Sequence, residues 1–303
     1  MASTPVTTPA VSSKQSSIGP IVAIALIVLA IVLYFTLDTK TAAPNFTVYH
    51  FAALGFILFF AGMASGMTGF AFSAIGAMAL FLLPPIVAVP MLQACSFFNQ
   101  GLSIAKLRKD MPKTLHDWFP YGPGPAILGG LAGVEAGVWI LNHLPGAGIM
   151  LILGILITLY SVYSTFKPEG FVLHHDHGDW PTGVVVGALG GAIGGFTAFP
   201  GLTVVVWVSL RDLAKAKARA ITQPFIMTLQ LAALITNAIH HPQNFGKPFW
   251  IMLALTVPAV LPGTLTGVWI YHRISEVNFK RAVFILLLVT GVGLLVKGWG
   301  GLH

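Results

Sequence analysis

Long apolar runs follow one another along the chain, and short stretches between them hold most of its charge. The first run, from Ile18 to Leu37, contains no charged residue. It is about 20 residues long, the length that a helix needs to cross a hydrocarbon core of roughly 30 Å. With 56% hydrophobic and 8% charged residues among 303, the chain has too little charge to cover a water-soluble globule. The sequence therefore predicts an all-α integral membrane protein, a polytopic helix bundle.

The N-terminal region is predicted to consist of a tail and an additional helix. Residues 1–17 are rich in Ser, Thr and Pro, which predicts a disordered tail. A cleaved signal peptide is the alternative for residues 18–37. The apolar run is long for such a peptide, and Thr41-Ala42-Ala43 is a weak cleavage site. We therefore expect residues 18–37 to form an extra transmembrane helix.

The chain contains an internal repeat. The tetrapeptide Gly137-Val138-Trp139-Ile140 recurs at residues 267–270, a shift of 130 positions (from 137 to 267). Many secondary transporters consist of two related halves embedded in the membrane. We therefore divide the chain into a first repeat, residues 48–166, a linker loop, residues 167–181, and a second repeat, residues 182–297.

Each repeat is expected to hold five apolar segments, the second of which is short. These segments are 48–67, 69–83, 86–106, 120–141 and 147–166 in the first repeat, and 182–197, 200–210, 217–239, 249–272 and 279–297 in the second. A short second segment is typical of a half-helix that packs against the first as a broken hairpin.

The basic residues predict that the two repeats are inverted. The loop after the third segment is basic in the first repeat, from Lys106 to Lys113, whereas its counterpart at residues 240–247 holds one lysine. In the second repeat the basic loops follow the second and fourth segments, at residues 211–219 and 272–281. Because Lys and Arg accumulate in cytoplasmic loops, the repeats must have opposite orientations. This places the N-terminus and the linker in the cytoplasm of a multi-pass protein of the cell inner (plasma) membrane. Lys106 and Arg219 are expected to extend from segment ends toward the membrane surface.

A Gly-rich stretch lies between the first two segments of each repeat. Gly62-x-x-x-Gly66 and Gly191-x-x-x-Gly195 are typical of helix contact faces, because small residues let backbones approach closely. The alternative is that these stretches break their helices within the membrane and expose backbone N–H groups, which bind anions. Under the second interpretation the candidate substrate-binding residues are Ser65, Thr68, Gly69, Gly195, Thr197 and Ala198.

The third segment of each repeat carries a pair of glutamines. Gln93 and Gln100 lie two helical turns apart on one face, and Gln223 and Gln230 repeat this spacing. One interpretation is structural, in which the glutamine amides form hydrogen bonds between neighbouring helices. Two equivalent pairs that face a symmetry axis favour substrate contact, since carboxamides donate hydrogen bonds to oxyanions. We therefore predict that all four glutamines bind the substrate.

Two further features are candidates for ion chemistry. Glu135 is the only acidic residue well inside an apolar segment, where a carboxylate must pair, be protonated or face water. It is our candidate for proton coupling, with a protonated structural role as the alternative. The segment from His174 to Asp179 has three histidines, but it lies in a polar loop of the kind that is usually solvated. We predict no metal site there.

The sequence does not support catalysis. It contains no nucleotide-binding P-loop, no Gly-x-Ser-x-Gly motif and no His-Glu-x-x-His motif. We expect no enzyme activity, no catalytic residue and no cofactor. The net charge of +7 belongs to the topology-determining loops, so no nucleic-acid partner is expected. The expected partners are a small anionic substrate and membrane lipid. The sequence is also compatible with a homo-oligomer.

The order of these motifs is informative. The Gly-rich stretch at residues 62–70 precedes Pro84-Pro85, which leads into the segment of Gln93 and its basic loop, and the pattern repeats from Gly187 onward. In this order, over about residues 50–297, the chain resembles the TauE/SafE sulfite exporter family. The resemblance implies an inner-membrane permease for sulfite, sulfonates or related small anions. Ala198 is among the residues that interrupt the usual glycine run.

We therefore predict a secondary transporter (permease) that moves a small oxyanion, such as sulfite or an organosulfonate, through a site between the repeats. A cation or metal-ion carrier that uses Glu135 and the His-rich loop is the alternative. A membrane enzyme or assembly factor without transport activity is a third possibility, and it would give no flux of any solute.

Overall fold

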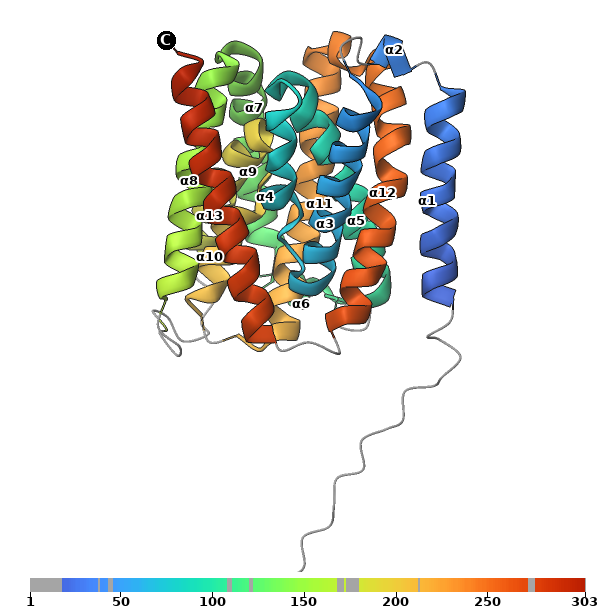
Figure 1. Ribbon diagram of the computed structural model, residues 1–303. Helices are drawn as coiled ribbons and strands as arrows, with labels where there is room; N and C mark the ends of the chain where they lie inside the picture. Colours follow the sequence, from blue (N-terminus) through green and yellow to red (C-terminus); the bar gives the residue numbers. More distant parts are fainter. Residues whose placement is uncertain are drawn as a thin grey trace, which may run out of the picture.

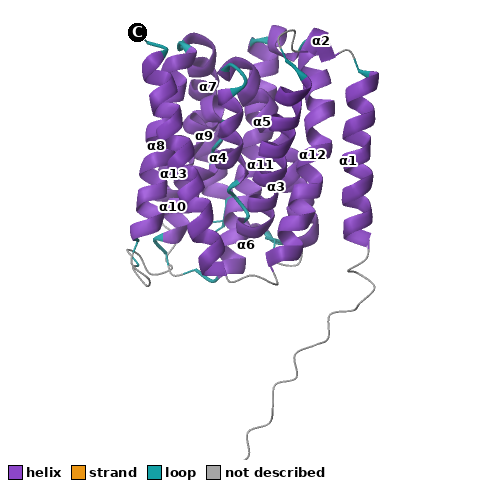
Figure 2. Cartoon of the chain, in the orientation of Figure 1, coloured by secondary structure: helices purple, strands orange, loops and turns teal. Residues whose placement is uncertain are grey.

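The protein is a bundle of helices (Figures 1 and 2). The computed structural model describes residues 18–37, 39–42, 46–107, 111–119, 122–167, 172, 180–211, 213–271 and 276–302. No β-sheet occurs in these ranges. The predicted tail at residues 1–17 and the His-rich loop at residues 174–179 lie outside them.

The helices follow one another along the whole described chain. They are α1 (Ile18–Thr36), α2 (Thr39–Ala42), α3 (Val48–Thr68), α4 (Phe72–Gly76), the 3-10 helix η2 (Ala77–Phe81), α5 (Pro85–Leu107), α6 (Leu115–Trp118), α7 (Gly124–His143), α8 (Gly146–Phe166), α9 (Trp180–Thr197), α10 (Gly201–Ser209), α11 (Lys215–His240), the 3-10 helix η3 (Pro242–Phe245), α12 (Lys247–Tyr271) and α13 (Glu276–Gly300).

Several of these helices have the length and composition of membrane spans. Within the described residues, six helices are long and apolar enough to cross a membrane, and they lie in α3, α7, α8, α11, α12 and α13. Large apolar side chains, such as Trp139 and Trp250, are exposed on the outside of the bundle. In water such a surface would be unfavourable, whereas hydrocarbon solvates it well. The chain is therefore a multi-pass membrane protein.

The helices pair between distant parts of the chain. α3 packs along α12, and α7 packs along α9. α5 packs against α11, and α8 against α13. α1 stands at the edge of the bundle beside α12 (Figure 1). The ring of Tyr34 at its end lies 5.5 Å from that of Phe51 in α3. That α1 spans the membrane stays a prediction.

Glycines allow the two closest pairs of helices to touch backbone to backbone. A Cβ on Gly191 of α9 would lie 2.0 Å from the carbonyl oxygen of Gly130 in α7. A Cβ on Gly267 of α12 would lie 2.0 Å from the carbonyl oxygen of Met63 in α3. A Cβ on Gly62 of α3 would lie 2.5 Å from the carbonyl oxygen of Val260 in α12. The glycine motifs of α3 and α9 are therefore helix contact faces.

The short segments α4 and α10 lie next to the core rather than on its rim. All five residues of α4 are buried, and Gly201, Leu202, Val204 and Val208 are the buried residues of α10. The rings of Phe72 and Phe199, which flank the two turns, are fully buried. The segments that follow α3 and α9 thus bring irregular backbone into the interior of the bundle.

Candidate functional site

Both α3 and α9 are broken at the same point of the repeat. Gly69, directly after α3, has φ 90° and ψ −8°. Ala198, directly after α9, has φ 60°. These two residues are equivalent under a shift of 129 (198 minus 69), and both adopt the left-handed conformation that ends a helix. The chain changes direction at each break, and the next helix, α4 or α10, starts within a few residues of it.

Ala198 is the one residue other than glycine with positive φ in the described chain, and its backbone is strained. Replacing Ala198 by glycine is therefore expected to leave the free energy of unfolding unchanged or to raise it slightly. The same replacement at Ala94, inside α5, is expected to lower it by about 1 kcal/mol, since glycine is a poor helix former. Thermal melting in detergent would compare the two variants, and equal losses would contradict the assignment of strain to Ala198.

Threonine hydroxyls hold the two breaks in shape. Thr68 Oγ1 accepts a hydrogen bond from the N–H of Ala71 at 3.1 Å, and Thr197 Oγ1 accepts one from the N–H of Phe199 at 3.1 Å. Each hydroxyl also donates back to its own helix, to the carbonyl oxygens of Ala64 and Ile193 respectively. Some of the backbone N–H groups that the sequence led us to expect as anion donors are therefore bound by threonine.

Three of the four glutamines bind the carbonyl oxygens at these breaks. Gln100 Nε2 donates to Gly69 at 3.1 Å, and Gln230 Nε2 donates to Ala198 at 2.8 Å. Gln93 Nε2 donates across the repeats to the carbonyl oxygens of Gly194 and Gly195, at 3.2 Å each. Each of these glutamines is at most 1% exposed. The second glutamine of each repeat thus holds the left-handed residue of its own repeat.

Because their N–H groups bind the backbone, these glutamines turn their side-chain oxygen atoms, Oε1, toward the interior of the bundle. A flipped amide would place Oε1 of Gln93 against two carbonyl oxygens, so its orientation is fixed by repulsion. The Oε1 atoms of all four glutamines are buried without a hydrogen-bond partner in the described chain. The hydroxyls of Ser96 and Ser103 on α5 are buried in the same way. We expected the carboxamides to donate hydrogen bonds to the substrate. The N–H groups of Gln93, Gln100 and Gln230 instead donate to backbone carbonyl oxygens.

Ser65 belongs to a structural network beside the first break. Asn99 Nδ2 donates to Ser65 Oγ at 2.7 Å, and Thr264 Oγ1 donates to Asn99 Oδ1 at 2.6 Å. The three side chains are 5% exposed or less and connect α5, α3 and α12. Ser65 therefore anchors the end of α3 to its neighbours.

Arg219 lies at the first break, where sequence reasoning did not place it. Its Nη2 donates to the carbonyl oxygen of Met67 at 2.6 Å, so the side chain turns inward from α11 to the end of α3. Its Nε lies 3.6 Å from the point where a Cβ on Gly69 would be. We expected Arg219 to extend toward the membrane surface. The signal that identifies it is its spacing, because it precedes Gln223 by one helical turn on the same face.

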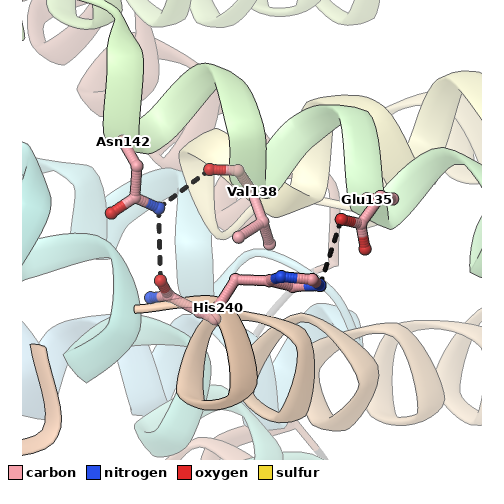
Figure 3. Close-up of polar contacts among 5 residues, drawn as sticks. Glu135, Val138, Asn142 and His240 are labelled. Atoms are coloured by element: carbon pink, nitrogen blue, oxygen red, sulfur yellow. Dashed lines mark hydrogen bonds and ion pairs between the residues drawn. The ribbon is translucent and has the colours of Figure 1, made fainter. Parts of the chain in front are cut away.

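Glu135 lies on the outer face of α7, apart from the breaks. Its Oε1 is 3.3 Å from Nε2 of His240, and the two side chains are 62% and 53% exposed respectively (Figure 3). Nearby, Asn142 donates to the carbonyl oxygen of Val138 and to Asn237 Oδ1. Sequence reasoning did not identify His240 as the partner of Glu135.

A metal site receives no support from the described side chains. No group of three His, Cys, Asp or Glu residues that could hold a metal ion occurs in the described part of the chain. The His-rich segment 174–179 lies outside that part.

The candidate site thus consists of two broken helices inside a membrane bundle, with buried amides on both breaks. No curated protein and no solved structure matched the chain when it was compared with them. A family model, that of the sulfite exporter TauE/SafE, matches residues 53–294. This match covers α3 to α13 and therefore includes both breaks and all four glutamines. The chain belongs to the TauE/SafE sulfite exporter family.

Proposed function

We propose that the protein is a secondary transporter that moves a small oxyanion, such as sulfite or an organosulfonate, through a site between two inverted repeats. The observation that carries the proposal is the pair of broken helices, because broken helices near the membrane midplane form the substrate sites of many transporters. Gly69 and Ala198 mark the breaks, and buried glutamines hold both of them. The N-terminus is cytoplasmic in this proposal, and the membrane is the cell inner (plasma) membrane.

The inverted repeat is supported by contacts that occur twice with the halves exchanged. Lys297 Nζ of α13 donates to the carbonyl oxygen of Leu80 at 2.9 Å, and Lys167 Nζ, after α8, donates to that of Ser209. The lysines are equivalent under a shift of 130 (297 minus 167), and the acceptors under a shift of 129 (209 minus 80). The pairing of α3 with α12 and of α9 with α7 exchanges the halves in the same way.

An anionic cargo is supported by the chemistry at the breaks. The side chains described there are hydroxyls, amides and the guanidinium of Arg219, whereas Glu135 lies on the outer face of α7. The cation-carrier alternative is favoured by one observation, the four buried Oε1 atoms, because carbonyl oxygens are good ligands for hard cations. Family membership favours the anion.

The test is flux into proteoliposomes that contain the purified protein. We expect saturable uptake of labelled sulfite or of a small labelled sulfonate, and no comparable uptake of labelled sodium, potassium or zinc in the absence of the anion. Cation flux without anion flux would establish the alternative. Absence of flux for every solute, in vesicles shown to contain folded protein, would exclude transport of these solutes.

The proton-coupling role of Glu135 is tested by Glu135→Gln. If the carboxylate carries the proton, a pH gradient is expected to accelerate anion flux in the native protein but not in this variant, because a carboxamide does not gain or lose a net proton near neutral pH. Flux down an anion gradient alone should remain. His240→Gln serves as the control, since it breaks the ion pair and leaves the carboxylate. Equal acceleration of both variants and the native protein would exclude coupling through Glu135.

A further inference from the structure

We propose that the anion is bound between the guanidinium of Arg219 and the carboxamide of Gln223 at the α3 break, and that it enters through a basic cleft at the N-terminal end of α11. This inference rests on the proposed function, because it names the anion-binding residues of that transport site. Neither the repeat pattern nor family membership points to Arg219.

Two donors of α11 lie against Gly69. Gln223 Nε2 lies 3.2 Å, and Arg219 Nε 3.6 Å, from the point where a Cβ on this residue would be. Gly69 has no side chain there, and its φ of 90° disfavours any other residue. Because Arg219 and Gln223 are four residues apart, α11 presents both on one face. The Nε of Arg219 and the Nε2 of Gln223 therefore lie against the same point of the broken backbone.

Gln223 differs from its three counterparts. Gln93, Gln100 and Gln230 donate to backbone carbonyl oxygens, whereas the carboxamide of Gln223 makes no hydrogen bond to any part of the chain that the structure describes. Gln223 is only 1% exposed, so solvent outside the bundle does not hydrogen-bond to its side chain. A buried carboxamide is stable only when a partner satisfies it. An oxyanion in contact with Nε2 would accept a hydrogen bond from it, whereas the buried Oε1 of Gln223 stays without a partner, like that of the other three glutamines.

Arg219 brings a positive charge to the break after α3. A guanidinium has five N–H donors in a planar fork, one of which binds Met67 here, and three oxygens on one sulfur match such a fork. The position equivalent to Arg219 in the first repeat is Val89 (219 minus 130). The positive charge therefore makes the break after α3 the stronger anion site of the two.

A cleft of about 550 Å³ lies at the N-terminal end of α11. Ala220 and Ile221 of α11, which directly follow Arg219, line it together with Lys113, His116 and Lys217. It is far larger than a three-oxygen anion and therefore suits an entrance better than a binding site. Basic side chains at a mouth raise the local concentration of anions.

Among the lining residues that the structure describes, Asp117 is the one carboxylate, and it is already engaged. Asp117 Oδ2 accepts hydrogen bonds from the N–H groups of Thr114 at 2.9 Å and Lys113 at 3.1 Å, and these bonds lower the pKa of Asp117. The N-terminus of α11, which begins at Lys215, adds the positive end of a long helix dipole. The cleft is therefore attractive to anions overall.

The test measures concentration-dependent flux of labelled sulfite in proteoliposomes. Arg219→Gln is expected to raise KM on the order of tenfold or more, because it removes a charge-assisted hydrogen bond to the anion. Arg219→Lys should restore part of the affinity. Lys217→Gln, in the cleft, should raise KM by a smaller factor. Lys247→Gln is the matched control, because this exposed cation begins α12 and lies outside the cleft, and it should leave KM unchanged.

The shift in melting temperature on adding sulfite distinguishes anion binding by Arg219 from a purely structural role as a cap on α3. Sulfite should raise the melting temperature of the native protein and not that of Arg219→Gln. Gln223→Glu places a carboxylate beside the guanidinium, which should keep the protein folded, displace the anion and abolish flux. If the native protein transports sulfite and both Arg219→Gln and Gln223→Glu keep its KM and its melting shift, the inference is wrong. Absence of flux in the native protein would instead remove the proposed function.

Discussion

A valine in place of Gly191 is expected to prevent the protein from folding. The Cβ would lie 2.0 Å from the carbonyl oxygen of Gly130 and 2.8 Å from its carbonyl carbon. These atoms belong to the backbone of α7, so no side-chain rotation relieves the overlap, and the two helices must separate along their contact. We expect a loss of more than about 4 kcal/mol in the free energy of unfolding, the range reached by the most disruptive core substitutions.

The measurement is the yield of monodisperse protein in detergent together with its melting temperature. Gly101→Ala is the matched control, because a Cβ on Gly101 of α5 meets no atom within 4 Å. Alanine is the better helix former, so this variant is expected to gain about 1 kcal/mol. A folded Gly191→Val protein with native melting behaviour would show that α7 and α9 do not touch through their backbones.

Alanine substitutions at the equivalent residues Gln93 and Gln223 are expected to have different effects, on stability for Gln93 and on flux for Gln223. Gln93→Ala leaves the buried carbonyl oxygens of Gly194 and Gly195 without their donor, which costs about 1 to 3 kcal/mol for each unsatisfied group. Its melting temperature should therefore fall. Gln223→Ala removes no hydrogen bond to a described residue, so its stability should change little, whereas sulfite flux should decrease about tenfold.

Both variants would be compared by melting in detergent and by flux per folded molecule in proteoliposomes. The native protein, and Gln93→Asn with its shorter amide, are the references for the structural effect. If the two alanine variants lose stability equally and keep normal flux per folded molecule, the glutamines only hold the helices together, and the site assignment at Gln223 fails.

Most of the architecture could be predicted from apolar patterning, because a membrane requires long uncharged helices and leaves few alternatives. The Gly-rich stretches were more ambiguous, since close helix contact and helix breaking both favour glycine. The structure has both features at neighbouring residues, with Gly62 and Gly191 in contacts and Gly69 at a break. The positive φ of Ala198 had no sequence signal, because alanine is usually helical.

The details of the candidate site depended on tertiary contacts. A carboxamide can donate or accept, so the sequence did not reveal that Gln93 would use its N–H groups on the backbone. Arg219 has a long flexible side chain near a helix end, where extension to the membrane surface and an inward turn are both available. Its inward turn depends on Met67, which is distant along the chain. The pairing of Glu135 with His240 likewise joins two helices whose contact no local pattern announces.

The pairing of α3 with α12 has a consequence for biosynthesis. Gly62 of α3 fits against the backbone of Val260, which a ribosome reaches nearly two hundred residues later. At about 5 to 20 residues per second, the glycine face of α3 waits in the membrane for on the order of 10 to 40 s before its partner arrives. The first half therefore cannot mature on its own, and a chain that stops after the linker would leave this face open to membrane chaperones and proteases.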